Sequence, residues 1–229
     1  NMKTDRSDPG SGSGGARAAV ASGAAARRTY RKSARADAER ATGQAILDAA
    51  LAAFSREPFD RVTLQRIARD SGVTVQTVLR RFGAKEQLFE TLAARELERV
   101  LAAREVDAGA GLRAALEALV AHYERDGDMT LNFVAQEHLF APIRAVVELG
   151  RQTHRRWVER HCAALLRGQR GARRRRLLHA AIAATDLGTW KLLRRDLGLA
   201  PAEVVAVMGE LLGGLASPRA AATPNTIQE

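Results

Sequence analysis

The chain has 229 residues, of which 46% are hydrophobic, 4% aromatic and 27% charged, a length that suits one large domain or two small ones. Its single cysteine, Cys162, excludes an internal disulfide and a cysteine-based zinc site. No apolar run is long enough to cross a bilayer, and no apolar segment typical of a signal peptide is evident. We therefore expect a cytoplasmic protein with no membrane partner.

The formal net charge of +10 at pH 7 favours an anionic partner. The excess is uneven, because residues 1–40 carry 9 Lys and Arg against 4 Asp and Glu, whereas residues 41–100 carry 9 against 8. Residues 1–40 begin rich in Gly, Ser and Ala and end basic, so we expect a disordered arm there. Two interpretations of this arm stay open: it contacts the phosphates or minor groove of DNA, or it is a solvated tail.

Ala, Leu, Glu and Arg recur at helical spacing and alternating β-branched runs are absent, which predicts an all-α fold of about nine helices. Caps and breakers divide the chain, including a predicted break at Asp126-Gly127-Asp128 and a disordered tail at 217–229. The expected helices are residues 41–56, 64–70, 75–82, 84–103, 112–125, 130–139, 142–167, 172–196 and 201–215.

Residues 59–89 are the most informative segment, because two short helices are joined there by a turn that contains glycine. Thr63 and Thr74 are suited to cap the two helices, and Gly72 can take a positive φ in the turn. Ala68 is small enough for the helices to cross closely. This pattern is a helix-turn-helix, whose second helix fits the major groove of duplex DNA.

Four residues of the second helix, Val75, Gln76, Leu79 and Arg80, are expected to turn outward. Gln76 is suited to paired hydrogen bonds with adenine and Arg80 with guanine, and Val75 can touch a thymine methyl group. Lys85 stands near the start of the next helix, where the helix N-terminus attracts phosphate. The pattern therefore predicts binding to double-stranded DNA.

This segment resembles bacterial transcription regulators of the tetracycline-repressor (TetR) type over residues 42–92. The core of the resemblance is GVTVQTVLRRFGAKEQLF, where the family has approximately Gly-Val-Ser-x-x-Thr-Leu-Tyr-x-x-Phe-x-x-Lys-Glu followed by apolar residues. The matching residues are Gly72, Val73, Thr77, Phe82, Lys85, Glu86 and Leu88. Thr74 and Val78 replace family residues conservatively. Leu79 departs from the pattern, since the family usually has there a tyrosine that reaches the DNA backbone.

The resemblance implies a homodimeric, sequence-specific regulator, in the first instance a repressor that a small-molecule effector releases from its operator. It places a DNA-binding domain at residues 41–90 and a helical ligand-binding and dimerisation domain at 91–216. The implied phosphate contacts are Thr63, Gln65, Thr77, Arg81 and Lys85. The implied base contacts are Val75, Gln76 and Arg80, and Thr74 completes the expected DNA-binding residues.

Two late helices form a four-helix bundle across a two-fold axis in this family, and here they would be residues 172–196 and 201–215. The last helix carries a broad apolar surface, which favours burial against a second copy, although packing within the monomer is the alternative. Its apolar residues are Val204, Val205, Val207, Met208, Leu211 and Leu212.

Polar and aromatic residues on the preceding helices suit a pocket for a small, largely apolar effector. The expected ligand-binding residues are Tyr123, Phe133, Glu137, Phe140, His154 and Trp157. No metal is expected, because the neighbouring residues Glu137 and His138 face different directions.

No catalytic constellation is evident, since the chain has no Gly-rich phosphate loop, no G-x-S-x-G elbow and no H-E-x-x-H pair. We therefore expect neither an enzyme nor a bound cofactor. Two alternatives to a repressor stay open. One is a transcriptional activator, and the other is a sequence-tolerant architectural DNA-binding protein, which would show no preferred site.

Overall fold

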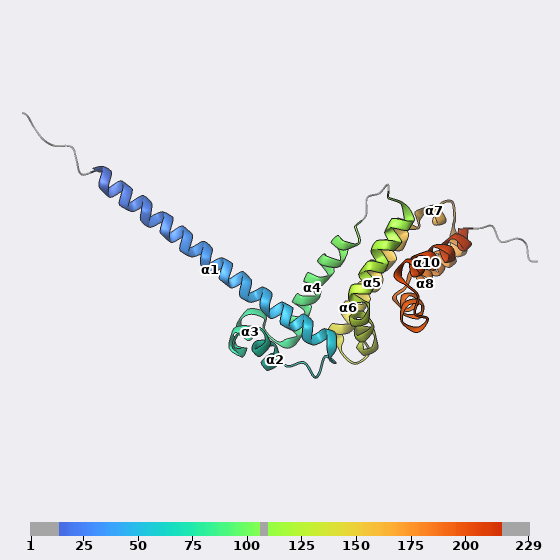
Figure 1. The fold of residues 1–229 in the computed structure, drawn as a ribbon, viewed down its shortest axis with the longest axis horizontal. Coiled ribbons are helices and arrows are strands. Elements are labelled where there is room, and N and C mark those ends of the chain that lie inside the picture. Colours follow the sequence, from blue (N-terminus) through green and yellow to red (C-terminus); the bar gives the residue numbers. More distant parts are fainter. Residues whose placement is uncertain (1–13, 106–109, 217–229) are drawn as a thin grey trace, which may run out of the picture.

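The computed structural model describes residues 14–105 and 110–216, and every regular element among them is a helix, which confirms the all-α prediction (Figure 1). The elements are α1 (Gly14–Arg56), α2 (Leu64–Asp70), α3 (Val75–Phe82), α4 (Lys85–Ala103), α5 (Gly111–Gln136), α6 (Ala141–His161), α7 (Ala163–Leu166), α8 (Gly171–Thr185), α9 (Leu187–Lys191), the π-helical turn η1 (Leu192–Asp196) and α10 (Pro201–Ala216). The expected disorder at 217–229 lies outside the described residues.

Helix α1 is longer than the sequence pattern predicts, because it begins at Gly14 instead of Ala41. Its N-terminal part extends away from the other helices (Figure 1). Residues 33–41 are exposed, and neighbouring turns of this segment are linked by the Arg35–Glu39 and Arg40–Asp37 ion pairs. Ala, Arg and Glu are strong helix formers, so the segment continues the helix without a core to pack on. The predicted arm at residues 1–40 is therefore helical wherever it is described.

Helix α5 runs without interruption through the Asp126-Gly127-Asp128 segment, so the predicted break is wrong. Gly127 is buried, and a Cβ added to it would lie 2.5 Å from the ring of Trp190. The indole nitrogen of Trp190 donates a hydrogen bond to Glu124 Oε1 at 2.8 Å. The glycine is thus a packing residue that lets a fully buried tryptophan approach the helix backbone, and it does not end the helix.

Two other predicted helices are divided. The predicted helix 142–167 is interrupted at Cys162, between α6 and α7. The predicted helix 172–196 breaks at Asp186, whose side chain accepts a hydrogen bond from the Gly188 amide at 2.8 Å and thereby caps α9.

The described residues form two hydrophobic cores. One lies among α5, α6, α8, α9 and α10, and Trp190, Leu119 and Met208 are fully buried in it. The other lies among α1 to α4, but it also contains Ile143 and Val147 from α6. The helix-turn-helix unit therefore shares its core with the helices that follow it.

Phe59 occupies the junction of these two parts. Its ring packs at 5.5 Å from Phe54 and at 5.3 Å from Phe140, measured between centroids. Its amide donates to Gln136 Oε1 at 2.9 Å, and its carbonyl accepts from Lys85 Nζ at 2.8 Å. Both backbone polar groups of a buried residue are thus satisfied by side chains from two different helices.

We predict that Gly127→Ala lowers the free energy of unfolding by about 1–3 kcal/mol, because the added methyl group overlaps the Trp190 ring. The matched control is Gly150→Ala on the exposed face of α6, where an added Cβ has no neighbour within 4 Å. Helix propensity should make that change stabilising by up to about 1 kcal/mol. Urea unfolding followed by circular dichroism measures both, and equal effects of the two substitutions would contradict the packing role of Gly127.

Candidate functional site

The α2–α3 unit has the local structure of a helix-turn-helix. Thr63 caps α2 by accepting a hydrogen bond from the Arg66 amide at 3.3 Å, and Thr74 caps α3 by accepting from the Thr77 amide at 3.2 Å. Gly72 has a φ of 71° in the turn, a conformation that side chains disfavour. The predicted bounds of both helices are confirmed.

The close crossing of α2 and α3 depends on small and apolar residues between them. Ile67, Ala68 and Val78 are buried there. The opposite face of α3 is left to solvent, with Gln76 and Arg80 exposed. Gln76 and Arg80 thus lie together on one outward-facing stripe, whereas Val75, the third residue predicted to read bases, is half-buried against the core of the unit.

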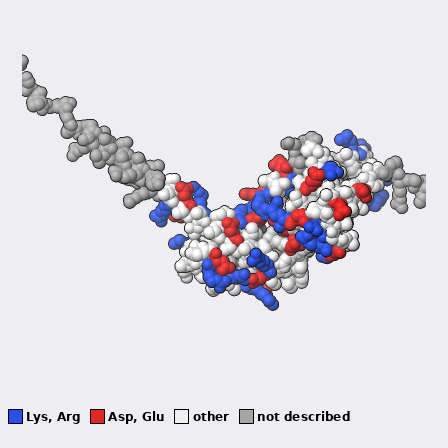
Figure 2. Space-filling model, in the orientation of Figure 1, with Lys and Arg blue, Asp and Glu red and all other residues white. Residues whose placement is uncertain are grey.

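Of the remaining predicted DNA-binding residues, Thr63, Gln65 and Thr74 are exposed, and Val75 and Thr77 are half-buried. Thr77 Oγ1 lies 2.9 Å from Thr74 Oγ1, so the two hydroxyl groups hydrogen-bond to each other. In the view of Figure 2, basic and acidic side chains alternate over the described surface. The face shown there carries no continuous basic surface.

The side chains of two predicted phosphate contacts, Lys85 and Arg81, also contact other parts of the protein. Lys85 donates to the Phe59 carbonyl and its ammonium lies 4.5 Å from the centroid of that ring. The guanidinium of Arg81 lies against α1, where a Cβ added to Gly43 would be 2.7 Å from Arg81 Nε. Arg81 is still exposed to solvent, whereas Lys85 is half-buried. The sequence did not predict this contact of Lys85 with Phe59, which lies 26 residues earlier in the chain.

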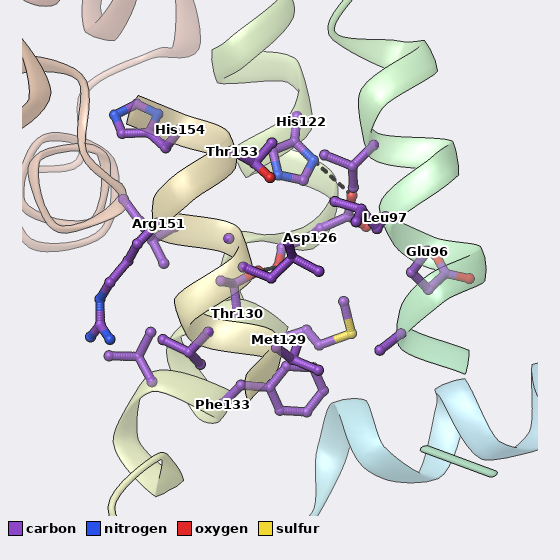
Figure 3. A pocket seen from close by; sticks show the side chains of 18 of the residues that line it. Glu96, Leu97, His122, Asp126, Met129, Thr130, Phe133, Arg151, Thr153 and His154 are labelled. Carbon is purple, nitrogen blue, oxygen red and sulfur yellow. Dashed lines mark hydrogen bonds and ion pairs between the residues drawn. The ribbon is translucent and has the colours of Figure 1, made fainter. Parts of the chain in front are cut away.

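A cavity of about 670 Å³ opens between α4, α5 and α6 and reaches the start of α9 (Figure 3). Most of its wall is apolar. Figure 3 shows Leu97 from α4, Met129 and Phe133 from α5, and a smaller number of polar groups that include His122, Asp126 and Arg151. A volume of this size with a mainly apolar wall and few polar groups is typical of a small-molecule site.

Three of the six predicted ligand-binding residues line this cavity: Tyr123, Phe133 and His154. The other three, Glu137, Phe140 and Trp157, are not among its lining residues.

Each of these three side chains has another contact. Glu137 forms a bidentate ion pair with Arg151, in which both hydrogen bonds are 2.6 Å long. The Phe140 ring packs on the Phe59 ring. Trp157 stacks on His154 at 5.9 Å between centroids. Glu137 and Phe140 lie just outside the helices, as the C-cap of α5 and the N-cap of α6, and Trp157 points from α6 away from the cavity lining.

A buried polar network at the cavity wall was not predicted. His122 Nδ1 lies 3.0 Å from Asp126 Oδ2, and Arg99 Nη2 donates to Asp126 Oδ1 at 3.0 Å. Burial would by itself raise the pKa of Asp126, but the hydrogen bonds from His122 and Arg99 outweigh it and lower that pKa to about 2. Because His122 and Asp126 are four residues apart, a continuous helix would have revealed this pair, and the predicted break in α5 hid it.

The two histidines on the wall are neutral at pH 7. Burial is the main cause of the lowered pKa of His122, and it lowers the pKa of His154 to about 4. Burial likewise raises the pKa of the Tyr123 hydroxyl, which donates to the Thr185 carbonyl at 3.2 Å.

Within residues 14–105 and 110–216, no group of three or more His, Cys, Asp or Glu side chains is arranged to hold a metal ion. In the same part of the chain, no helix has the length and apolar character needed to cross a membrane.

Comparison with known proteins identifies the N-terminal unit. Residues 46–92 match a family model described as bacterial regulatory proteins, tetR family. No match was found among curated proteins.

Solved structures of similar fold extend the likeness over most of the chain. A tetR-family regulator from Streptomyces coelicolor has 19% identity and a TM-score of 0.59, over 76% of this chain and 86% of its own. A TetR-like regulator from Rhodococcus sp. RHA1 has 21% identity and a TM-score of 0.60, over 77% and 97%. The regulator FadR from Bacillus subtilis, in complex with stearoyl-CoA, has 16% identity and a TM-score of 0.56, over 76% and 97%. At these identities the likeness shows the fold.

We predict that Asp126→Asn removes a pH-dependent contribution of about 2 kcal/mol to the free energy of unfolding. The folded-state pKa of Asp126 is lowered, so the unfolded chain binds more protons in acid. Stability from this group is complete above about pH 5 and is lost as the pH falls toward 2.

Urea unfolding of both proteins between pH 7 and the lowest pH at which they fold measures this. The difference in unfolding free energy between them should shrink as the pH falls. A matched control is Glu117→Gln, an exposed carboxylate on the same helix, which should leave the profile nearly unchanged. A constant difference across the pH range would show that the pKa of Asp126 is the same in the folded and the unfolded protein, which would contradict the lowered folded-state pKa.

Proposed function

We propose that this chain, which belongs to the tetR family of bacterial regulatory proteins, is a homodimeric transcriptional repressor that a small-molecule effector releases from its operator. The observation that carries the proposal is the cavity on α4 to α6, together with the core that α6 shares with the DNA-binding unit. One molecule then contains a DNA-reading helix, a ligand-sized cavity and a packed connection between them.

Operator reading is assigned to the exposed stripe of α3. In a two-fold symmetric dimer, two such helices lie about one helical turn of DNA apart, roughly 34 Å, and read a palindromic site. Gln76 and Arg80 read bases, and Val75 contacts a thymine methyl group. Thr63, Gln65, Thr74, Thr77 and Arg81 position the protein on phosphates. Lys85 joins them only if its ammonium leaves the Phe59 carbonyl.

Helix α4 couples the two parts. Leu88 near its start is buried in the core of the DNA-binding unit, and Phe89 belongs both to that core and to the cavity wall. Leu97, Val100 and Arg104 near its other end also line the cavity. An effector that displaces the distal end of α4 would tilt the recognition helix and change the spacing in the dimer. The effector can weaken DNA binding by no more than the difference between its binding free energies for the tilted and the untilted conformations.

The stearoyl-CoA complex of the Bacillus subtilis regulator supports an effector with a large apolar part, because that regulator shares this fold. The mainly apolar wall of the present cavity suits such a ligand.

Dimerisation is assigned to α8 and α10. Three large apolar side chains on or next to this region are exposed in the single chain: Leu192, Leu197 and Leu211, at 50%, 62% and 46%. Burial of such side chains against a second copy is favourable because apolar surface leaves water.

We predict that Gln76→Ala with Arg80→Ala abolishes the preference for a specific operator, since base readout by a good paired hydrogen bond contributes about 1–3 kcal/mol. Selection of bound sequences from random duplex DNA at near-physiological salt gives the operator of the wild-type protein, and competition binding then measures its loss. The control is Arg155→Ala, which removes one positive charge from an exposed position on α6. A variant that still discriminates the palindrome would contradict the assignment of α3. A repressor and an activator are distinguished by transcription in vitro from a promoter that carries this operator.

We also predict that Leu211→Glu converts the dimer to a monomer, because a charge then faces the partner at the two-fold axis. Light scattering after size-exclusion chromatography measures the mass, and circular dichroism checks the fold. Leu139→Glu, at a more exposed position between α5 and α6, should leave the dimer intact. A wild-type protein that is itself monomeric at micromolar concentration would contradict the proposed dimer.

A further inference from the structure

Arg104 is a buried cation at the cavity wall. The residue is only 9% exposed, and it lines the cavity at the C-terminal end of α4. Its Nε has no hydrogen-bond partner, and no carboxylate of the described residues lies within ion-pair distance of its guanidinium. Its guanidinium carbon lies 5.4 Å from the centroid of the Tyr123 ring, and Asp126 attracts it from beyond ion-pair distance. Burial outweighs these contacts and lowers the pKa of Arg104, so its charge is incompletely compensated.

The other charges on the wall are compensated. Asp126 is paired with Arg99, Glu96 is paired with Arg99 as well, and Arg151 is paired with Glu137. The remaining acidic residues on the wall are exposed to solvent, namely Glu90, Glu98 and Asp186. Within residues 14–105 and 110–216, Arg104 is therefore the buried charge on this wall that has no ion-pair partner.

The hydrogen bonds of His154 exclude it as a second cation. The Thr185 hydroxyl donates to the Ala181 carbonyl at 2.8 Å, so its oxygen accepts from His154 Nε2 at 3.2 Å. The proton of the neutral ring then sits on Nε2, and Nδ1 is left as a buried acceptor without a partner. The His154 side of the cavity offers no anion site, and the buried positive charge is concentrated at Arg104.

We propose that the effector is an amphipathic organic acid, whose carboxylate pairs with Arg104 and whose apolar body fills the rest of the cavity. The proposal concerns the cavity of the proposed function and rests on it. The planar guanidinium matches a carboxylate through two parallel hydrogen bonds, which satisfies the orphaned donor and neutralises the buried charge. Leu97, Met129 and Phe133 form the apolar surface for the body of the ligand.

The test is a headgroup comparison on the full chain without DNA. Two series of compounds are compared, and within each series only the headgroup changes from carboxylate to alcohol to amine. The first series is dodecanoate, dodecanol and dodecylamine, and the second is 4-phenylbutyrate, 4-phenylbutanol and 4-phenylbutylamine. Isothermal titration calorimetry measures each Kd below the micelle-forming concentration. We expect at least one acid to bind about tenfold or more tightly than its matched alcohol and amine.

The matched variant is Arg104→Met, which keeps a long side chain and removes the charge, a change that buried ionic sites often tolerate. It should weaken binding of the acid by about tenfold or more and leave the alcohol unchanged. Arg104→Lys keeps the charge without the planar fork and should fall between the two. If Arg104→Met does not fold, Arg104→Gln serves for the same comparison.

The proposal is overturned if neither acid binds, if an alcohol or amine binds as tightly as its acid, or if Arg104→Met binds the acid like the wild type. Release from the operator is measured separately by fluorescence anisotropy of labelled DNA. An acid that binds through Arg104 but leaves the operator complex intact contradicts effector release and not the ligand class. A compound that releases DNA equally from wild type and Arg104→Met contradicts the ligand class and not effector release.

Discussion

The shared hydrophobic core between the helix-turn-helix unit and α6 is the contact on which the rest of the structure depends. Helices α2 and α3 have only 7 and 8 residues, and the core that they share with α1 and α4 is completed by Ile143 and Val147 of α6. Phe59 fastens this junction by its ring, its amide and its carbonyl. Closely packed interiors transmit displacement and do not absorb it. The orientation of the recognition helix is therefore set by the helices that also build the cavity.

Helix α4 is the element with one end in each part. Its proximal end is fixed in the shared core, while its distal half meets α5 through the ion pair between Arg99 and Asp126. In the proposed function, a ligand that enters beside this pair changes the contacts of α4 with its neighbours. In the proposed binding mode, Arg104, whose Nε has no hydrogen-bond partner among the described residues, attaches an anionic ligand to the C-terminal end of this helix. The proposal therefore assigns to one helix the link between ligand binding and DNA binding.

The sequence predicted what local chemistry determines. Thr63, Thr74 and Gly72 are cap and turn signals that act within a few residues, so the bounds of α2 and α3 followed from them. Contacts between distant residues were not predictable in this way. In the sequence Gly127 predicts a helix break, but in the structure it makes room for the ring of Trp190, 63 positions later in the chain. The position of Lys85 near a helix start predicts a phosphate contact, and its packing against the Phe59 ring is seen only in the folded structure. The cavity residues followed the same rule, because the direction of a side chain within a helix turn depends on tertiary packing.

In the proposed function, occupancy of the cavity changes the spacing of the two recognition helices. Pulsed electron–electron double resonance measures this spacing on a dimer that carries a spin label at Arg69→Cys, next to the α2–α3 turn. Arg69 is exposed, so a cysteine there is accessible to the label. The native Cys162 is buried, which raises its thiol pKa to about 11 and slows its labelling. We expect a narrow distance distribution on operator DNA. Addition of an acid that dissociates the complex should shift the mean distance. An identical distribution for the free protein with and without that acid would contradict the account.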